Sequence, residues 1–317
     1  MSELKNNYQV NNTFTEVSTF LAQRKGILLA GGQGKRLAPL TNVVSKQLMA
    51  VYDKPMIYYS LSTLMLCGIK DILLVSDPDN LDKYNQLLCD GSQWGINITY
   101  AVQQKPEGVA QSILIGEEFI DTSPIAIALG DNIFHGNDLI TLIRSADSNY
   151  KGGTVFAYPV RDPQNYGVVQ FDRSGSVLDI EEKPKEPSSQ YAVTGLYFYD
   201  NTAVERVKNL TFSSRGELEI TDLNRQYIKD NLLNVQMMGR GIAWLDTGTI
   251  DAMQEASLYI RTLEHRQGLK IGCPEEIAWR QGWINDQQLE LLANNLINSG
   301  YGKYLIKLLK GRDNKFL

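Results

Sequence analysis

The sequence predicts an α/β protein, and three observations lead to this class. Short apolar runs at residues 26–30, 71–75 and 125–129 have the length of buried strands, and each ends at a glycine or a polar residue. The segments between these runs carry apolar residues at helical spacing. Strands that alternate with helices of this length form βαβ units and hence a parallel sheet covered on both faces. We therefore expect a Rossmann-like, mostly parallel central sheet flanked by helices.

Local patterns predict the other elements. Pro55 is suited to open a helix and Gly68 to close it, because proline fits the first helical turn and glycine the residue after the last. Further elements are expected at residues 81–88 and 109–119 as helices and 96–102 as a strand. After Gly153 the pattern changes to strands at 154–160, 167–171, 177–180 and 192–199, with Arg173-Ser174-Gly175 as a hairpin turn. This half reads as a mixed sheet. Helices return at 218–229, 250–266 and across 275–310.

Composition and length set the expected organisation. The chain has 317 residues, of which 43% are hydrophobic, so a sizeable core can form. Residues 1–24 are polar and unpatterned, and they predict a loose N-terminal extension without the apolar run of a secretory signal. Residues 25–249 are expected to form the α/β core, and residues 250–317 a helical C-terminal region.

Charge and cysteine usage limit the class of protein. The net charge of -5 makes bulk binding to nucleic acid or an anionic membrane unexpected, so any phosphate must meet a local cluster of cations. No apolar stretch reaches 18 residues, which predicts no transmembrane helix. The three cysteines form no C-x-x-C pattern, as is typical of reduced thiols in a cytoplasmic protein, and zinc is not expected beside only two histidines.

A glycine-rich loop follows the first predicted strand and reads Ala30-Gly31-Gly32-Gln33-Gly34-Lys35-Arg36-Leu37. Glycines let the backbone approach an anion, and their N–H groups can point at phosphate oxygens. The loop is not a Walker A motif, because Arg36 follows Lys35, and Leu37 stands where a dinucleotide fingerprint has its third glycine. The alternative is a tight surface turn. Arg36 and Lys46 together could hold the β- and γ-phosphates of a triphosphate. Considered alone, Lys46 would be interpreted as a solvated surface lysine.

Two further segments carry carboxylates and a lysine. Asp131 ends a predicted buried strand, and Asp246 lies far along the chain before Thr247-Gly248-Thr249. Two such aspartates could hold one Mg²⁺ with triphosphate oxygens and water, although either could instead cap a helix or a turn. In the run ending at Pro184, Lys183 offers a point charge to a monophosphate and Glu182 can accept hydrogen bonds from sugar hydroxyls. The alternative is a solvated strand end.

These loops, in this order, resemble the glucose-1-phosphate thymidylyltransferases, a family of sugar nucleotidyltransferases. The resemblance runs from about Lys25 to Leu309. Long unbroken stretches carry it: residues 52–59, 90–95, 192–200 and 215–222, which read YDKPMIYY, DGSQWG, AVTGLYFYD and RGELEITD. The resemblance implies a nucleotidyltransferase fold, Mg²⁺ as cofactor, dTTP and glucose 1-phosphate as substrates, and a homotetramer.

The resemblance also implies roles for individual residues. It places Leu29, Ala30, Gly31, Gly32 and Gly34 on the nucleotide with Arg36 and Lys46, and Asp131 and Asp246 on the metal. A base pocket would be formed by Gln103 and Gly108, since a glutamine amide can both donate to and accept from the imide edge of a pyrimidine. The sugar phosphate site would be formed by Tyr166, Gly167, Glu182, Lys183, Val193, Arg215 and Trp244.

The chain departs from the usual family pattern at five positions. Gln33 and Lys35 stand where serine and threonine are common, Ala38 replaces an aromatic residue, Ala50 a proline and His135 a tyrosine. Lys35 is the departure expected to alter triphosphate affinity.

Three other functions remain open at this point. A uridylyltransferase would read the same imide edge through Gln103. A catalytically silent, sugar-nucleotide-binding regulatory subunit would be expected to lack the loop arginine or a metal aspartate, and both are present. A dinucleotide-dependent oxidoreductase is disfavoured by the missing third glycine.

The C-terminal region carries many apolar side chains but none of the charges assigned to chemistry. One alternative is that these apolar side chains cover the sheet of their own subunit. The other, which the resemblance implies, is that they contribute to subunit contacts. The resemblance further implies inhibition by dTDP-rhamnose at a second nucleotide-sugar site. The apolar residues are Ile260, Leu263, Leu269, Ile277, Trp279, Trp283, Ile284, Leu291, Leu292, Leu296, Tyr301, Tyr304 and Leu305.

Overall fold

The computed structural model describes residues 24–32, 34–148 and 150–311. The extension predicted for residues 1–24 therefore lies outside the described residues, except for its last member. Arg24 is buried and belongs to the folded core, so the boundary lies before it.

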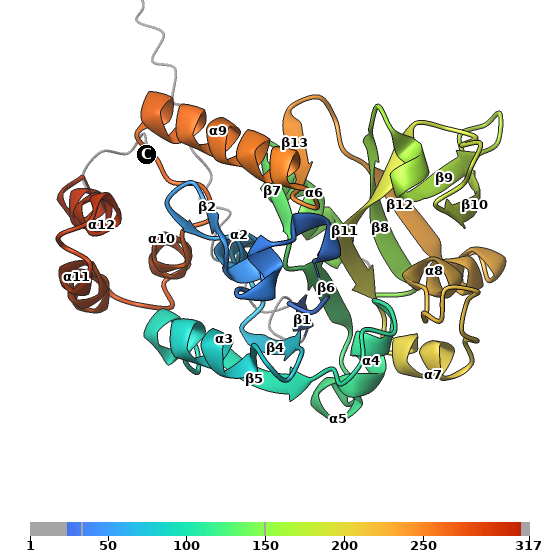
Figure 1. Cartoon of the computed structure of the whole chain (residues 1–317), viewed down its shortest axis with the longest axis horizontal. Coiled ribbons are helices and arrows are strands. Elements are labelled where there is room, and N and C mark those ends of the chain that lie inside the picture. The colour runs from blue at the N-terminus through green and yellow to red at the C-terminus, as the bar shows by residue number, and fades with distance from the viewer. Residues whose placement is uncertain (1–23, 33, 149, 312–317) are drawn as a thin grey trace, which may run out of the picture.

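A nine-stranded sheet forms the centre of the molecule, with seven strands in the order β10-β9-β11-β6-β1-β4-β5 and with β8 and β12 continuing from β11 (Figure 1). The strands are β1 (Lys25–Leu29), β4 (Asp71–Ser76), β5 (Asn97–Val102), β6 (Ile125–Leu129), β8 (Gly153–Pro159), β9 (Gly167–Phe171), β10 (Val177–Glu182), β11 (Tyr191–Tyr199) and β12 (Leu233–Met237). The pairs β1–β4, β1–β6 and β4–β5 are parallel, whereas β11 runs antiparallel to β6 and β8. The predicted parallel sheet with a mixed half is confirmed.

Two small ribbons accompany the sheet. They are β2 (Ala50–Val51) with β3 (Lys54–Pro55), and β7 (Asn132–Gly136) with β13 (Ile242–Asp246). The second ribbon is important for the site, because it brings Asp246 opposite Asn132.

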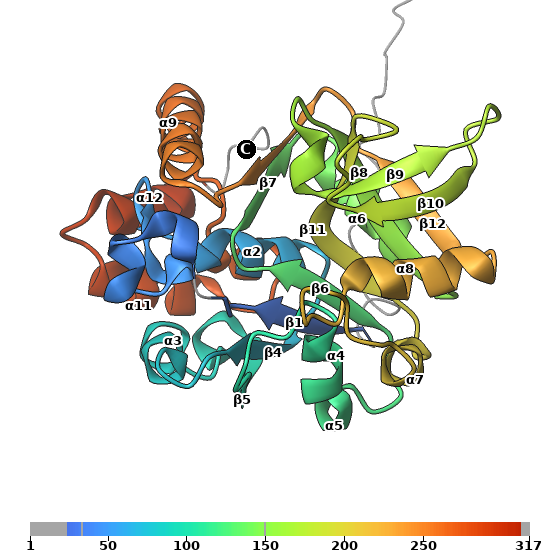
Figure 2. The same ribbon diagram turned by 45° about the vertical axis from the view of Figure 1, so that its right-hand side comes forward.

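Helices cover both faces of the sheet because both faces of its strands are apolar. In β1, Leu28 belongs to one core cluster with α2, whereas Ile27 belongs to another cluster on the opposite face. Figure 2 shows α7 and α8 beneath the mixed half. The helices that precede the C-terminal region are α2 (Ile57–Leu66), α3 (Leu81–Leu88), α4 (Gln111–Ile115), α5 (Glu117–Ile120), α6 (Leu139–Asp147), α7 (Ala203–Lys208) and α8 (Ile220–Lys229).

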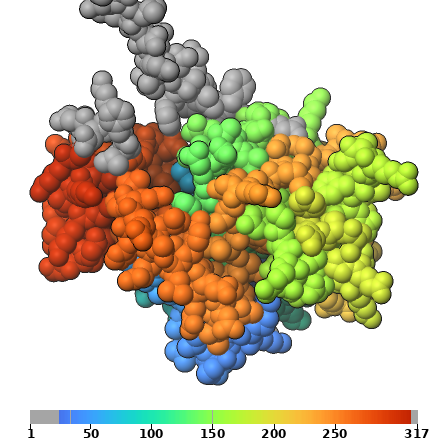
Figure 3. All heavy atoms as spheres, turned by 90° about the horizontal axis from the view of Figure 1, so that it is seen from above, coloured from blue at the N-terminus to red at the C-terminus, as the bar shows by residue number. Residues whose placement is uncertain are grey.

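The C-terminal helices are α9 (Ile250–Gln267), α10 (Pro274–Arg280), α11 (Asp286–Asn295) and α12 (Gly300–Lys310). Helices α11 and α12, red in Figure 3, lie at the opposite end of the molecule from the mixed half, whereas α9, orange, reaches toward the centre. Most apolar side chains of this region pack on their own chain, among them Tyr301, Tyr304 and Leu305. Leu291 and Leu296 are exposed, at 64% and 42%. An element boundary lies at residues 249 and 250, and the division into domains there stays a prediction.

Two local predictions were wrong. Pro55 does not open a helix but pairs with Ala50 in the β2–β3 ribbon, and the helix begins at Ile57. The helix expected over 109–119 is divided into α4 and α5 at Gly116, where a Cβ atom would lie 2.9 Å from a methyl group of Leu73.

A buried charge network ties the β2–β3 ribbon to the end of α9. The ammonium of Lys54, 3% exposed, contacts the carboxylates of Asp53 and Glu264 at 2.7 and 3.1 Å. Glu264 also accepts hydrogen bonds from Lys270 and from the backbone N–H of Ile271. A lysine buried to this degree needs such partners, because an unpaired buried charge is strongly unfavourable.

Arg24 holds the start of β1 in place. Its guanidinium pairs with Asp147 of α6 and donates to the backbone oxygens of Ile125 and Tyr199 at 2.9 and 3.0 Å. Both side chains of the ion pair are 1% exposed.

We expect Arg24→Ala to lower the free energy of unfolding by about 3 to 5 kcal/mol, because it leaves a buried carboxylate without its counter-ion. Urea denaturation measures this change. As a control, Arg161→Ala removes a pair with Asp162 whose arginine side chain is 94% exposed, and it should cost less than about 1 kcal/mol. Equal losses in the two variants would show that the Arg24 pair does not stabilise the fold.

Candidate active site

Two neighbouring cavities lie at the carboxyl ends of the central strands. The first has a volume of about 530 Å³ and opens between the β7–β13 ribbon and the mixed half. It brings together these predicted site residues: Arg36, Asp131, Tyr166, Gly167, Glu182, Lys183, Val193, Arg215, Trp244 and Asp246. The second cavity, of 450 Å³, lies beside the glycine-rich loop and includes Gly32, Lys46 and Gln103.

Lys46 joins the two cavities. It lines the second cavity, and its ammonium contacts the carboxylate of Asp131 in the first cavity at 2.5 Å. The lysine is 6% exposed, so it is not the solvated surface lysine that its sequence position alone would suggest. The other oxygen of Asp131 accepts a hydrogen bond of 2.7 Å from the Asn132 amide.

Asp131 and Asp246 meet although they are far apart in the sequence. Asp131 follows β6, and Asp246 ends β13 opposite Asn132. Burial raises the pKa of Asp246, the negative charge of Asp131 raises it further, and Lys46, Arg36 and Tyr166 lower it. The site therefore holds two carboxylates that repel each other and two cations that offset them.

Asp246 is not a helix cap. The first turn of α9 is capped by Thr249, whose side-chain oxygen accepts the Ala252 N–H at 3.2 Å. Arg36 and Asp246 both lie against Gly248. A Cβ atom at this glycine would stand 2.6 Å from the Arg36 guanidinium and 3.3 Å from the Asp246 carboxylate. The glycine at 248 is thus needed for the close approach of this arginine.

The glycine-rich loop lies directly after β1. Gly32 and Gly34 have φ values of 105° and 55°, which L side chains rarely adopt. Leu29 accepts the Gly130 N–H at 2.8 Å, and Ala30 is fully buried, so the loop starts next to the segment that carries Asp131. The departure at Gln33 lies outside the described residues.

Gln103 lies against the loop. A Cβ atom on Gly31 would stand 2.6 Å from the Gln103 amide oxygen, and the amide nitrogen donates to the Gln111 oxygen at 2.6 Å. Gly108 lies next to Gln103 and packs against the backbone of Leu218, where a Cβ atom would be 2.3 Å from the carbonyl oxygen. The structure thus explains Gly108 by packing, and it places Gln103 in the second cavity, beside the glycine-rich loop.

The first cavity is rich in paired charges. Glu182 accepts a hydrogen bond from Thr221 at 2.6 Å and contacts Arg215 at 3.2 Å and Lys183 at 3.5 Å. Arg215 contacts Glu219 as well, at 2.7 Å. The backbone N–H of Lys183 donates to the backbone carbonyl oxygen of Tyr166 at 2.9 Å. Lys183 has a φ of 46°, so this hydrogen bond holds the lysine at the cavity in a backbone conformation that is unfavourable for a residue with a side chain.

Sequence reasoning missed the role of Asn132. Its side-chain oxygen accepts hydrogen bonds from the Trp244 indole at 2.6 Å and from the Gly195 N–H at 3.0 Å, while its amide donates to Asp131. It therefore connects β7, β11 and β13 behind the carboxylates. The feature of the sequence that could have indicated this role is the position of Asn132 directly after Asp131, at the end of a predicted strand.

The other departures from the family pattern line neither cavity. Lys35 begins the short 3-10 turn that contains Arg36, Ala38 directly follows this turn, and Ala50 lies in β2. His135 contacts the Tyr259 hydroxyl at 3.1 Å, and burial lowers its pKa.

The described residues contain no group of three or more His, Cys, Asp or Glu side chains that could hold a metal ion. In the same part of the chain, no helix is both long enough and apolar enough to cross a membrane.

A family model described as "Nucleotidyl transferase" matches residues 25–262. The chain belongs to this family, and the residues that the model matches include both cavities.

Curated relatives point to a narrower group within this family. The glucose-1-phosphate thymidylyltransferase of Xanthomonas campestris pv. campestris is 56% identical over 92% of this chain and 98% of its own. That of Neisseria meningitidis is 54% identical over 90% of this chain and 99% of its own. The resemblance to this group is confirmed.

Solved structures agree with the fold. A Bacillus anthracis protein assigned as a glucose-1-phosphate thymidylyltransferase, in complex with sucrose, aligns with a TM-score of 0.70 and 39% identity, over 75% of this chain and 95% of that one. A UDP-glucose pyrophosphorylase complexed with UDP-glucose aligns with a TM-score of 0.66 at 24% identity, over 76% of this chain and 99% of that one, which supports the fold alone.

We expect Asn132→Ala to lower the free energy of unfolding by about 2 to 3 kcal/mol, because the Trp244 indole and the Gly195 N–H lose their acceptor in a buried position. Urea denaturation followed by tryptophan fluorescence measures the loss. Asn165→Ala is the control, since the Asn165 amide makes only an exposed contact of 3.4 Å. If both variants unfold at the same urea concentration, Asn132 does not connect the three strands as described.

Proposed function

We propose that the chain transfers a dTMP group from dTTP to glucose 1-phosphate, giving dTDP-glucose and pyrophosphate. The observation that carries this proposal is the Lys46–Asp131 pair, which joins a cavity lined by the glycine loop to a cavity lined by sugar-site residues. The names of the relatives at 54–56% identity support the choice of both substrates.

In the proposed reaction, a phosphate oxygen of glucose 1-phosphate attacks the α-phosphorus of dTTP. A new P–O bond forms there, and the bond to the β-phosphate breaks as pyrophosphate leaves. The nucleophile is already an anion, so no side chain has to remove a proton. The main obstacle is repulsion between two polyanions, and positioning and charge neutralisation therefore supply most of the catalysis.

The residues of the chain divide this task. Lys183 and Arg215 receive the phosphate of the sugar, and Arg36 and Lys46 receive the phosphates of the nucleotide. Because Lys46 lies where the two cavities meet, it is suited to the position where nucleophile and α-phosphorus come together. Gln103 is suited to the pyrimidine, since its amide oxygen lies at Gly31 beside the loop.

Asp131 and Asp246 fit a Mg²⁺ ion. Both offer hard oxygen ligands, their mutual repulsion raises the pKa of Asp246, and two carboxylates completed by phosphate oxygens and water are a common Mg²⁺ set. A bound Mg²⁺ would supply charge neutralisation at the transferring phosphate.

A panel assay of pyrophosphate release tests the substrates. With glucose 1-phosphate, we propose that dTTP is turned over faster than UTP, ATP, CTP or GTP. Faster turnover of UTP would favour a uridylyltransferase, and no turnover with any pair would favour a regulatory, nucleotide-sugar-binding subunit.

Lys183→Ala should raise the KM for glucose 1-phosphate about tenfold, a loss of roughly 1.4 kcal/mol in binding, with a smaller effect on the KM for dTTP. The reason is that Lys183 lines only the sugar-side cavity. Lys185→Ala is the matched control, because this exposed lysine lies two residues away and lines neither cavity. An unchanged KM for the sugar phosphate in Lys183→Ala would contradict the assignment.

Asp131→Asn and Asp246→Asn should each reduce turnover by at least about 100-fold, because each removes a ligand of an ion that lowers the reaction barrier by several kcal/mol. The thermal transition of Asp246→Asn should stay at or above that of the unchanged protein, since burial and Asp131 disfavour the Asp246 charge. Asp162→Asn, outside both cavities, controls for loss of charge. A variant that kept normal Mg²⁺ dependence would show that its aspartate is no ligand.

The family resemblance extends the proposal to a cytoplasmic homotetramer that begins dTDP-rhamnose synthesis and is inhibited by dTDP-rhamnose outside the active site. The exposed Leu291 and Leu296 of the C-terminal region support subunit contacts there, although most of its apolar side chains pack on their own chain. Light scattering should report a tetramer at micromolar concentration. A monomer there, or inhibition that is purely competitive with dTTP, would contradict these two statements.

A further inference from the structure

Three polar side chains in the segment from the end of β5 to the start of α4 form a hydrogen-bonded row, the amide network of Gln103, Gln111 and Glu107. The Gln103 amide nitrogen donates to the Gln111 amide oxygen at 2.6 Å, and the Gln111 amide nitrogen donates to the Glu107 carboxylate at 2.7 Å. The backbone N–H of Glu107 also donates to the Gln111 amide oxygen, at 3.3 Å. Gln103 lines the second cavity, whereas Gln111 and Glu107 line neither cavity of the site.

The carboxylate at the end of this network fixes the orientation of both amides. A carboxylate only accepts hydrogen bonds, so Glu107 must receive the NH2 group of Gln111. The amide oxygen of Gln111 then points the other way and must receive the NH2 group of Gln103. If either amide turned over, like groups would face each other in a half-buried position, and a buried polar group that loses its partner costs more than the hydrogen bond contributes.

Gln103 is held by further hydrogen bonds. Its backbone N–H donates to the Ser76 carbonyl oxygen at 2.7 Å, and the residue is only 5% exposed. Its amide nitrogen donates to the Gly108 carbonyl oxygen at 3.5 Å, in addition to the Gln111 oxygen. Both donors of this amide are therefore used within the protein.

The amide oxygen of Gln103 is the group that remains for a ligand. Within the described residues, no N–H or O–H group donates to it. It is not one of the fully buried polar atoms that lack a partner, so it is accessible from the second cavity. A Cβ atom at residue 31 would stand 2.6 Å from this oxygen, so a side chain there would cover it and Gly31 leaves it open.

We propose that Glu107 and Gln111 are positioning residues for selection of the base, because they commit Gln103 to accepting a hydrogen bond from it. The inference rests on the proposed function, since it takes the second cavity as the site of the base. Thymine and uracil present a ring N–H to such an acceptor, whereas the corresponding ring nitrogen of cytosine is itself an acceptor. Two acceptors would then oppose each other, so the amide network selects thymine and uracil over cytosine.

Glu107→Gln tests the amide network without a change in side-chain size. A glutamine at this position can donate as well as accept, so both amides can turn over and Gln103 can present its NH2 group to cytosine. Calorimetry on the full chain measures the Kd of dTTP and of dCTP without sugar phosphate, so that no transfer occurs. We expect the unchanged protein to bind dTTP more tightly. Glu107→Gln should reduce the ratio of the Kd for dCTP to the Kd for dTTP about fivefold, the factor expected for one neutral hydrogen bond.

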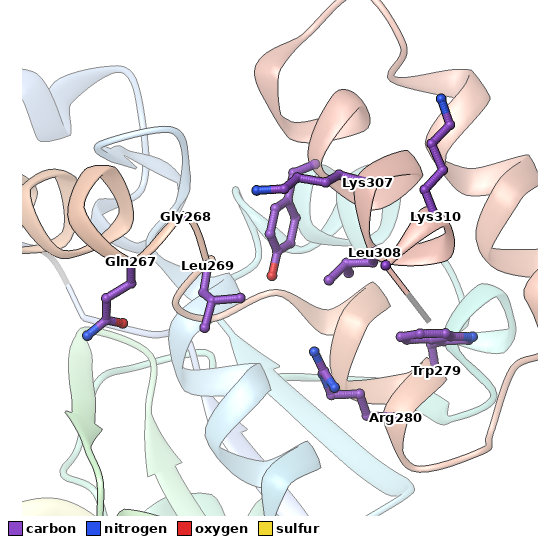
Figure 4. Close-up of a pocket in the computed structure, with 10 residues that line it drawn as sticks. Gln267, Gly268, Leu269, Trp279, Arg280, Lys307, Leu308 and Lys310 are labelled. Carbon is purple, nitrogen blue, oxygen red and sulfur yellow. The ribbon is translucent and has the colours of Figure 1, made fainter. Parts of the chain in front are cut away.

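Matched controls separate positioning from a structural effect. In a Gln103→Leu background, Glu107→Gln should leave the Kd ratio unchanged, because no amide remains to be oriented. Glu118→Gln makes the same change at an exposed carboxylate that lines neither cavity, and it should also leave the ratio unchanged. Lys307→Ala is a remote control with the same expected result, because Lys307 lines a separate cavity of about 330 Å³ among the C-terminal helices (Figure 4). Thermal denaturation shows whether each variant is folded.

The possible outcomes distinguish this inference from the proposed reaction. An unchanged Kd ratio in Glu107→Gln, or an equal change of the ratio in the Gln103→Leu background, would overturn the positioning role. UTP should bind to the unchanged protein more tightly than CTP, because uracil presents the same ring N–H as thymine, and the reverse order would overturn the selection of the base. Selective binding of dTTP without release of pyrophosphate would contradict the proposed reaction while supporting the amide network.

Discussion

The balance between two carboxylates and two cations at the ends of β6 and β13 is the constraint on which the rest of the site depends. Asp131 and Asp246 repel each other in a partly buried position, and Lys46 and Arg36 offset that repulsion. Such an arrangement is stable only if all four groups are held close together, because an unpaired buried charge is costly. The glycine at 248 that admits Arg36 and the β7–β13 ribbon both serve this requirement.

The residues around these charges come from both halves of the molecule. The parallel half supplies the glycine loop and Asp131, and the mixed half supplies Tyr166, Glu182 and Lys183. Asn132 hydrogen-bonds to Asp131, Gly195 and Trp244, so it connects the strand end that carries Asp131 to the wall of the first cavity. A ligand that binds across both cavities would therefore meet groups whose positions are already set, which reduces the entropy lost on binding.

Much of this could be predicted from the sequence, and the failures have a common cause. The strands at 125–129 and 167–171 and the helix at 81–88 were predicted with the correct bounds, because their apolar patterns are local. The strands β7, β12 and β13 were not predicted, since pairing between distant segments forms them. Likewise, Asp131 and Asp246 were identified, but the contact between Lys46 and Asp131 was not, because nothing local connects residues so far apart in sequence.

The Lys54 network limits how the chain can be recombined with its relatives. Lys54 in the β2–β3 ribbon finds its counter-ions in Asp53 and in Glu264 of α9. The C-terminal helices are therefore not a detachable module: a chimera whose new helices placed no acid opposite Lys54 would keep that lysine buried without one of its counter-ions. Such helices should be tolerated only when residues 50–55 are exchanged together with α9, so the two segments constrain each other despite the long stretch of sequence between them.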